Sequence, residues 1–220
     1  MLQQLKEHNR LHETLFMGAM TLCCFGFFVF RVFYSRTLAF LFLNWNLFLA
    51  IIPWLLSSLA TIRPSIQKSK IMVVLLWGVW LLFFPNAPYI LTDLFHLKLQ
   101  FTMPVWFDLV LILSFAWAGL MFGFLSLWDI ERILCKSINE KAVRCLSVAL
   151  LFVSGFGIYI GRYLRWNSWD IITEPFRLLD DIGDRITNPL GHARTWGMTL
   201  FMGLFLNFIY WSFRLIQKRK

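Results

Sequence analysis

Six long apolar runs constrain this chain more than any other feature, because a helix that crosses a lipid bilayer needs about 20 apolar residues. The runs cover approximately residues 15–33, 37–62, 71–84, 105–127, 145–161 and 195–213. They lack the alternation typical of barrel strands, and only 15% of the chain is charged. The first run is too long for a signal peptide and has no small-residue cleavage pattern. We therefore predict an all-α, polytopic membrane bundle of about six transmembrane helices, forming a single domain over residues 1–220.

The third run is unusually short and ends in a break. Ile71–Phe84 holds only 14 apolar residues, and it is followed at once by Pro85-Asn-Ala-Pro-Tyr-Ile-Leu-Thr-Asp-Leu-Phe-His96. Proline disfavours a helical residue before it, so Pro85 and Pro88 should end one helix and begin another, with Pro88 in the first turn and Asn86 as its cap. We predict a short interfacial or re-entrant helix over about 87–99.

The predicted short helix should be amphipathic. Tyr89, Asp93 and His96 are spaced i, i+4 and i+7, which places them on one stripe of an α-helix. The opposite positions are apolar: Ile90, Leu91, Leu94 and Leu97. The polar stripe is expected to face the other helices.

The net charge of +9 mainly reflects how Lys and Arg are divided between the two sides of the membrane. Taking the loops alternately, one side holds 13 Lys and Arg and the other holds 8. An excess of Lys and Arg in short loops marks the cytoplasm, so both termini are predicted inside. Nucleic-acid binding is excluded because it needs a soluble basic face.

The cysteines lack paired spacing, and we expect no disulfides.

On this topology the polar residues of the membrane segments gather at the outer face. Any one of these residues alone is explained by hydrogen bonding between helices or by the aromatic belt at the membrane interface. Their number on one face favours a binding or catalytic site, because ionisable groups at membrane depth are costly. Serines of the inner halves, such as Ser57, Ser58, Ser126 and Ser147, are expected only to bond to their own helix. The outer candidates are Asn44, Asn46, Asn86, Tyr89, Asp93, His96, Asp108, Tyr159, Arg162, Arg165, Asn167 and Asp170.

These residue types permit three chemistries. Asp93, His96 and Asp108 are the candidate catalytic acids and base, and Arg162 with Arg165 could clamp a phosphate or carboxylate. The remaining outer candidates are expected to bind substrate. Metal binding stays open, with Asp93, His96, Asp108, Asp170 and His192 as possible ligands, but no metal-ligand motif accompanies them. Serine-hydrolase and nucleotide-binding motifs are lacking, and the sequence names no cofactor.

We predict that one outward cavity gathers these groups, with Asp93 or Asp108 within salt-bridge reach of Arg162 or Arg165, because unpaired charges at membrane depth are costly. The outer loop, about 163–193, reads as an acidic amphipathic helix that forms a lid on the membrane surface. Its apolar positions are Phe176, Leu179 and Ile182, while Asp180, Asp181 and Asp184 should face away.

Three motifs resemble an integral-membrane family catalogued as domain of unknown function 1361. They are Phe84-Pro-Asn-Ala-Pro-Tyr-Ile-Leu-Thr-Asp-Leu-Phe-His96, Trp45-Asn-Leu-Phe-Leu-Ala50 with Pro53, and Gly161-Arg-Tyr-Leu-Arg-Trp-Asn-Ser-Trp-Asp170. The resemblance covers nearly the whole chain and implies a bacterial multi-span protein of the cytoplasmic membrane, without a reaction or substrate.

Three functions remain open from the sequence. The first is a membrane-embedded enzyme that acts on a lipid or lipid-linked, phosphate-bearing substrate from the outer leaflet. The second is a non-catalytic protein that binds or transports a ligand, for which the partner would be a lipid headgroup or an anionic small molecule. The third is a structural subunit whose polar residues serve only helix packing.

Overall fold

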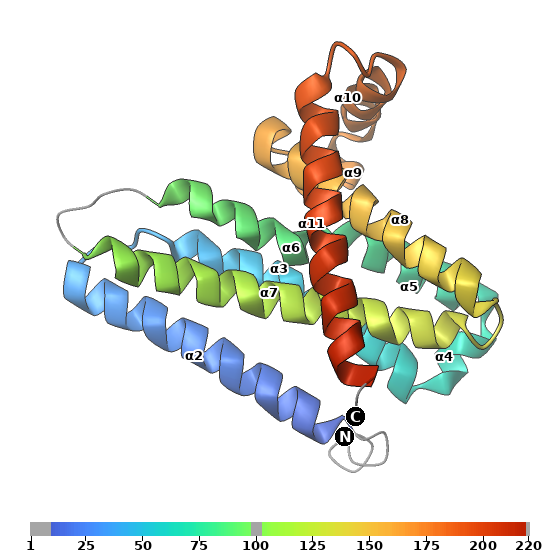
Figure 1. Cartoon of the computed structure of the whole chain (residues 1–220), viewed down its shortest axis with the longest axis horizontal. Coiled ribbons are helices and arrows are strands. Elements are labelled where there is room, and N and C mark those ends of the chain that lie inside the picture. The colour runs from blue at the N-terminus through green and yellow to red at the C-terminus, as the bar shows by residue number, and fades with distance from the viewer. Residues whose placement is uncertain (1–9, 98–102, 219–220) are drawn as a thin grey trace. The chain divides into compact units, whose positions relative to one another are not determined.

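The protein is a polytopic helical bundle, as predicted. The computed structural model describes residues 10–97 and 103–218, and its regular elements there are helices (Figure 1). In these residues six segments are long and apolar enough to cross a bilayer: Leu11–Ser35, Leu41–Ile62, Ile71–His96, Val105–Leu134, Glu140–Leu164 and Ala193–Ile216. The last residues of the predicted 87–99 helix lie outside the described part.

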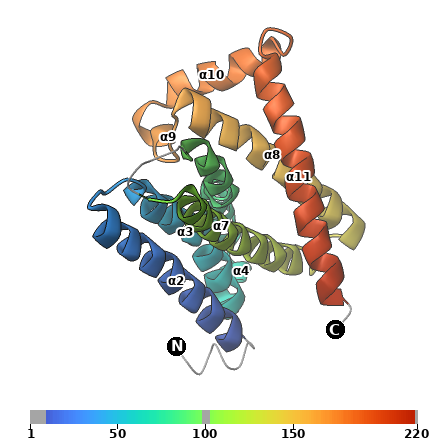
Figure 2. The same cartoon turned by 60° about the vertical axis from the view of Figure 1, so that its left-hand side comes forward.

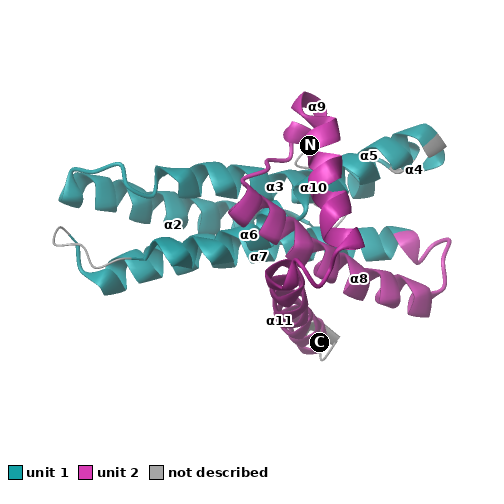
Figure 3. Cartoon of the chain, turned by 90° about the horizontal axis from the view of Figure 1, so that it is seen from above, with its two compact units in different colours: residues 1–133 teal, residues 134–220 magenta. Residues whose placement is uncertain are grey.

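The helices form two compact units (Figure 3). Unit 1 covers Met1–Ile133 and unit 2 covers Leu134–Lys220. The single domain over 1–220 stays a prediction. The helices of unit 1 are α2 (Leu11–Ser35), α3 (Leu41–Ile62), α4 (Pro64–Lys68), α5 (Lys70–Phe83), α6 (Asn86–Tyr89), the 3₁₀ helix η1 (Ile90–His96) and α7 (Val105–Leu134), which ends at the unit boundary.

A tight turn joins α2 to α3, which therefore begins four residues later than the predicted span. Arg36 and Phe40 have positive φ angles of 55° and 69°, conformations that side-chain-bearing residues rarely adopt. The Arg31 side chain explains why the turn is held, because its Nη1 donates to Thr37 Oγ1 at 3.1 Å and to the Ala39 carbonyl at 3.5 Å. The turn is thus organised around a buried arginine.

The proline break after α5 packs on a glycine pair of α7. α5 ends at Phe83 and α6 begins at Asn86 with Pro88 in its first turn, as predicted, but Phe84 and Pro85 keep helical backbone angles. A Cβ at Gly119 would lie 2.6 Å from the Ala87 carbonyl, and one at Gly123 would lie 2.8 Å from the Ala87 Cβ. Small residues four apart let two membrane helices approach closely. Glycines of α7 therefore allow the broken segment to pack without leaving the bundle.

Unit 2 is a pair of long helices joined by a helical hairpin. It contains α8 (Glu140–Tyr159), the π-helical turn η2 (Ile160–Leu164), α9 (Asp170–Thr173), α10 (Pro175–Thr187) and α11 (Ala193–Lys218). α8 begins five residues before the predicted span, where the Asn139 side chain accepts a hydrogen bond from the Lys141 amide as an N-cap. A Cβ at Gly155 would lie 2.9 Å from the Thr199 carbonyl, so α8 and α11 are in backbone contact there.

Candidate functional site

One end of unit 1 holds a buried carboxylate beside a half-exposed histidine. Asp93 lies in η1 and its side chain is 1% exposed, whereas that of His96, one 3₁₀ turn later, is 46% exposed. Asn46 of α3 donates from Nδ2 to Asp93 Oδ2 at 2.8 Å, and His96 Nδ1 lies 3.9 Å from Asp93 Oδ1. The His96 ring also lies 4.9 Å from the Phe42 ring. We call Asn46, Asp93 and His96 the Asp93 site.

The 3₁₀ geometry of η1 changes which residues share a face. A 3₁₀ helix has about three residues per turn, so Ile90, Asp93 and His96 align. Asp93 does face the other helices, as predicted, but Ile90 is equally buried, against Gly119. The predicted division into one polar stripe and an opposite apolar face is therefore wrong, because it assumed α-helical spacing.

The predicted cap at Asn86 is also wrong. Asn86 is the first residue of α6, and the residue before it, Pro85, makes no side-chain cap. The Asn86 Nδ2 donates backward to the Phe83 carbonyl at 3.0 Å, which accounts for one carbonyl at the end of α5. Asn44 similarly bonds its own helix, donating to the Leu41 carbonyl at 3.5 Å, and Tyr89 is half-buried.

Asp108 forms an ion pair with an arginine that sequence reasoning left out of the site. Arg31 Nε lies 2.7 Å from Asp108 Oδ1, and Arg31 Nη2 lies 3.2 Å from Asp108 Oδ2. The two side chains are 0% and 1% exposed. The Arg31 guanidinium also lies 4.6 Å from the Phe40 ring centroid. Both carboxylate oxygens of Asp108 accept from a buried guanidinium, so this geometry favours helix anchoring over acid–base chemistry.

The remaining candidates lie in unit 2 around η2. Tyr159 stacks on Tyr163 with ring centroids 5.0 Å apart, Arg162 is half-buried, and Arg165 is exposed with a positive φ of 63°. Asp170 Oδ2 accepts from the Asn167 amide at 2.6 Å, across the turn that precedes α9. The predicted convergence of Arg162 and Arg165 with Asp93 or Asp108 stays a prediction.

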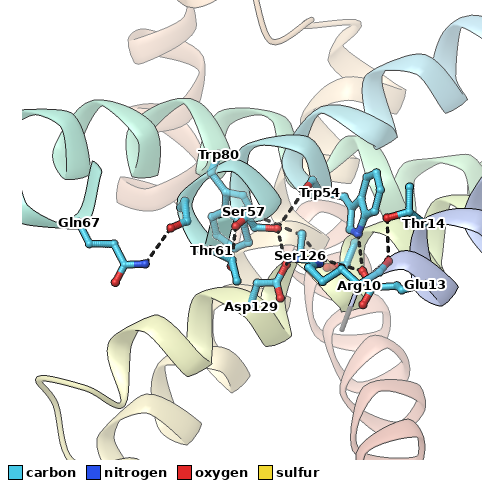
Figure 4. Close-up of polar contacts among 12 residues, drawn as sticks. Arg10, Glu13, Thr14, Trp54, Ser57, Thr61, Gln67, Trp80, Ser126 and Asp129 are labelled. Atoms are coloured by element: carbon cyan, nitrogen blue, oxygen red, sulfur yellow. Dashed lines mark hydrogen bonds and ion pairs between the residues drawn. The ribbon is translucent and has the colours of Figure 1, made fainter. Parts of the chain in front are cut away.

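The opposite end of unit 1 holds a buried polar network that the sequence analysis missed (Figure 4). Arg10 Nη1 lies 2.7 Å from Asp129 Oδ2, and Arg10 Nη2 donates to Glu13 Oε1 at 2.7 Å. Ser57 donates to Asp129 Oδ2 at 2.9 Å, and Trp54 Nε1 donates to Glu13 Oε1 at 2.8 Å. The network joins α2, α3 and α7.

Arg10 stays charged in this network. Burial of Arg10 lowers the pKa of its guanidinium, but the carboxylates of Asp129 and Glu13 together raise it more, so the pKa lies above its ordinary value. The expectation that Ser57 and Ser126 bond only to their own helices is wrong as well. Ser57 reaches Asp129, and Ser126 Oγ accepts from Trp80 Nε1 at 3.3 Å.

Matched spacing was the signal that could have revealed both arginine pairs. Arg31 follows Arg10 by 21 residues, and Asp129 follows Asp108 by the same number. Two antiparallel helices with that spacing bring both pairs together. At 1.5 Å per residue, 21 residues rise about 31 Å, close to the thickness of about 30 Å of a hydrocarbon core.

The described residues contain no group of three or more His, Cys, Asp or Glu placed to hold a metal ion. His192, considered above as a ligand, lies with Nε2 2.7 Å from Asp184 Oδ2. The Asp93 site supplies one carboxylate and one imidazole, which suits proton transfer better than metal binding.

Comparisons with known proteins identify a family and nothing more specific. No curated protein and no solved structure matches this chain. The model of a family described as "Protein of unknown function (DUF1361)" matches residues 45–209. This range includes the Asp93 site, the η2 turn, and Arg162 and Arg165, the arginines predicted to bind an anion. The match covers well over half of the chain and confirms the resemblance, and the chain therefore belongs to the DUF1361 family.

Proposed function

We propose that this protein is a membrane-embedded enzyme in which the Asp93 site performs acid–base chemistry on a lipid or lipid-linked, phosphate-bearing substrate at the outer leaflet. The observation that carries the proposal is the pairing of a buried carboxylate with a half-exposed imidazole, 3.9 Å apart. A buried acid that only anchored helices would have no need of a solvent-accessible partner.

The Asp93 site resembles, in its geometry, a carboxylate that orients a catalytic histidine. Asn46 holds one oxygen of the Asp93 carboxylate, and the other oxygen points toward His96 Nδ1. A carboxylate beside Nδ1 favours the tautomer that carries its proton there and stabilises the imidazolium that forms when Nε2 accepts a proton. In this role His96 Nε2 is the base, Asp93 is a positioning residue, and the 3.9 Å contact shortens when substrate binds.

The substrate class in this proposal comes from charge and topology. The loop charges favour a topology in which His96 and the arginines Arg162 and Arg165 face the outer compartment. Guanidinium groups bind phosphate through paired N–H donors, and a half-exposed histidine at the end of a membrane span meets headgroups more readily than acyl chains.

Transport is the less favoured alternative because a polar path through unit 1 is lacking in the described part of α7. Between Asp108 and Asp129, its buried side chains are largely apolar and include Leu111, Ile112 and Phe115. An ion or proton crossing this stretch would need polar partners. Within α7, a largely apolar stretch thus separates Asp108 from Asp129.

Lipid analysis of cells with and without the protein tests the proposal. Membranes are compared by mass spectrometry from a deletion strain complemented with wild type, His96→Gln, Asp93→Asn or the control His12→Gln. His12 is exposed at the other end of unit 1, so its variant controls for loss of a histidine. We expect the His96 and Asp93 variants to reproduce the lipid profile of the deletion strain at wild-type protein levels, while His12→Gln restores the wild-type profile.

Two outcomes would overturn the enzyme proposal. One is a lipid profile that does not depend on the protein at all, which would favour the structural alternative. The other is full complementation by His96→Gln, which would show that the imidazole takes no part.

A further inference from the structure

The hairpin between α8 and α11 carries large apolar side chains that are exposed. Along α10, Phe176, Leu179 and Ile186 are 80%, 62% and 58% exposed, and Ile172 of α9 and Leu190 after α10 are 81% and 93% exposed. We call these five residues the α10 apolar face. Large apolar patches on one helix face indicate an interaction surface, whereas single exposed residues do not.

One side of α10, with Asp181 and Arg185, contacts its own unit, while Arg177, Asp180 and Asp184 are exposed. Asp181 Oδ2 accepts from Trp166 Nε1 at 2.8 Å, and Arg185, only 8% exposed, donates to the Asp181 carbonyl at 2.6 Å. Arg177 lies over the Trp166 ring at 5.5 Å. A helix of a water-soluble protein typically packs its apolar side inward, whereas Phe176, Leu179 and Ile186 are exposed here.

The contacts of α10 place it at the end of a membrane span. Trp196, in the first turn of α11, donates from Nε1 to the Arg185 carbonyl at 3.0 Å. α10 lies across the ends of α8 and α11 (Figure 2), and only residues 188–192 separate it from α11. A tryptophan in the first turn of a span marks the membrane–water interface, so α10 is held at that depth.

The charge of the hairpin selects the kind of lipid surface. Between Asp170 and His192 there are five acidic residues and two arginines. Amphipathic helices that bind anionic lipids are rich in Lys and Arg on the polar side. This hairpin has the opposite balance, so anionic headgroups would repel it.

We propose that the α10 apolar face inserts into the interfacial layer of the bilayer and binds zwitterionic phospholipid, so that the hairpin is a lipid-contact surface independent of the Asp93 site. Asp181 stays bonded to Trp166 and the Arg185 carbonyl to Trp196, while acyl chains replace water at the apolar face. The lid predicted from the sequence to lie on the membrane surface is, in this proposal, inserted into lipid through its apolar face.

Depth-dependent quenching on the full-length protein tests the proposal. Cys23, Cys24, Cys135 and Cys145 are first replaced by Ala. A single cysteine is then introduced by Leu179→Cys or, as the matched control on the polar side, by Asp180→Cys, and an environment-sensitive fluorophore is attached. The protein is reconstituted into phosphatidylcholine vesicles that include phosphatidylcholine with a nitroxide near the top of the acyl chain.

We expect the fluorophore at residue 179 to lose most of its emission to the nitroxide lipid and the one at residue 180 to keep most of its own. Replacing part of the phosphatidylcholine by phosphatidylglycerol should reduce the quenching at residue 179. Leu190→Cys provides a second apolar-face probe at a loop position whose substitution removes little packing.

Equal quenching at residues 179 and 180 would overturn the proposal. So would a blue-shifted but unquenched fluorophore at residue 179, which would show that protein, from this chain or a second copy, covers the face. Stronger quenching in phosphatidylglycerol would overturn the lipid preference.

Discussion

Removing the carboxylate of Asp108 should destabilise the protein far more than removing the whole Arg31–Asp108 pair. Arg31 is 0% exposed, and its guanidinium donates to Asp108 through Nε and Nη2 and to Thr37 through Nη1. In Asp108→Ala a buried cation loses both charged acceptors. Breaking a buried pair on one side typically costs about 3–5 kcal/mol of the free energy of unfolding.

The double variant Arg31→Met with Asp108→Leu should keep most of the stability, within about 1 kcal/mol of wild type, because it removes both charges and the desolvation they require. Ser35 remains satisfied in that variant, since its Oγ donates to the backbone carbonyl of residue 31 at 2.8 Å. The two variants therefore separate the cost of an orphaned charge from the net contribution of the pair.

The measurement is equilibrium unfolding of the full-length protein in mixed micelles titrated with sodium dodecyl sulfate, followed by far-UV circular dichroism. Glu174→Ala is the control, since the Arg177–Glu174 pair is 75% and 52% exposed and such a pair contributes only about 0–1 kcal/mol. A loss of less than about 1 kcal/mol in Asp108→Ala would refute the reasoning. A double variant as unstable as the single one would refute it too.

Other features of the structure lead to further predictions. Asp129→Ala removes one of the two carboxylates bound to Arg10 and leaves Glu13 in place, so it should cost about 1.5–3 kcal/mol in the same unfolding assay, and no effect would contradict a stabilising network. Gly155→Ala should cost about 1–3 kcal/mol because its Cβ would lie 2.9 Å from a carbonyl of α11, while Gly197→Ala, which meets nothing within 4 Å, should be neutral or stabilising. A cysteine introduced at Glu174 should react with an impermeant thiol reagent in intact cells and one at Glu140 should not, and the reverse pattern would invert the predicted topology.

The spans and the proline break could be predicted because each depends on local sequence. Apolar length identified the six helices, and Pro85 with Pro88 marked the end of α5. The pairing of Asn46 with Asp93 could not be predicted, although both were candidates, since it depends on how α3 packs against η1. The 3₁₀ form of η1 was missed because α-helical spacing was assumed from the sequence, and the close packing of Ile90 on Gly119 depends on contacts distant in the chain.

The buried arginine pairs were missed because the search for polar residues at membrane depth did not include them. Arg31 lies inside the predicted 15–33 run, and Asp129 lies two residues past the predicted 105–127 run. Charged residues within a turn or two of a predicted span boundary are as informative as those inside it, because helices extend beyond their apolar runs. α7 continues to Leu134, seven residues past the predicted end, and buries Asp129 on the way.

The Arg31–Asp108 pair has a consequence for how the chain is made. Asp108 is synthesised 77 residues after Arg31, and at about 5–20 residues per second that delay lasts roughly 4–15 s. During that time the first span carries an unneutralised guanidinium that lipid accepts poorly. Until the fourth span emerges, we expect the first helix to remain beside the insertion machinery or to lie with Arg31 at the level of the lipid headgroups. Membrane integration of this protein is thus expected to proceed by the release of α2 and α7 together, and a ribosome stalled before residue 108 should leave α2 extractable by alkaline carbonate.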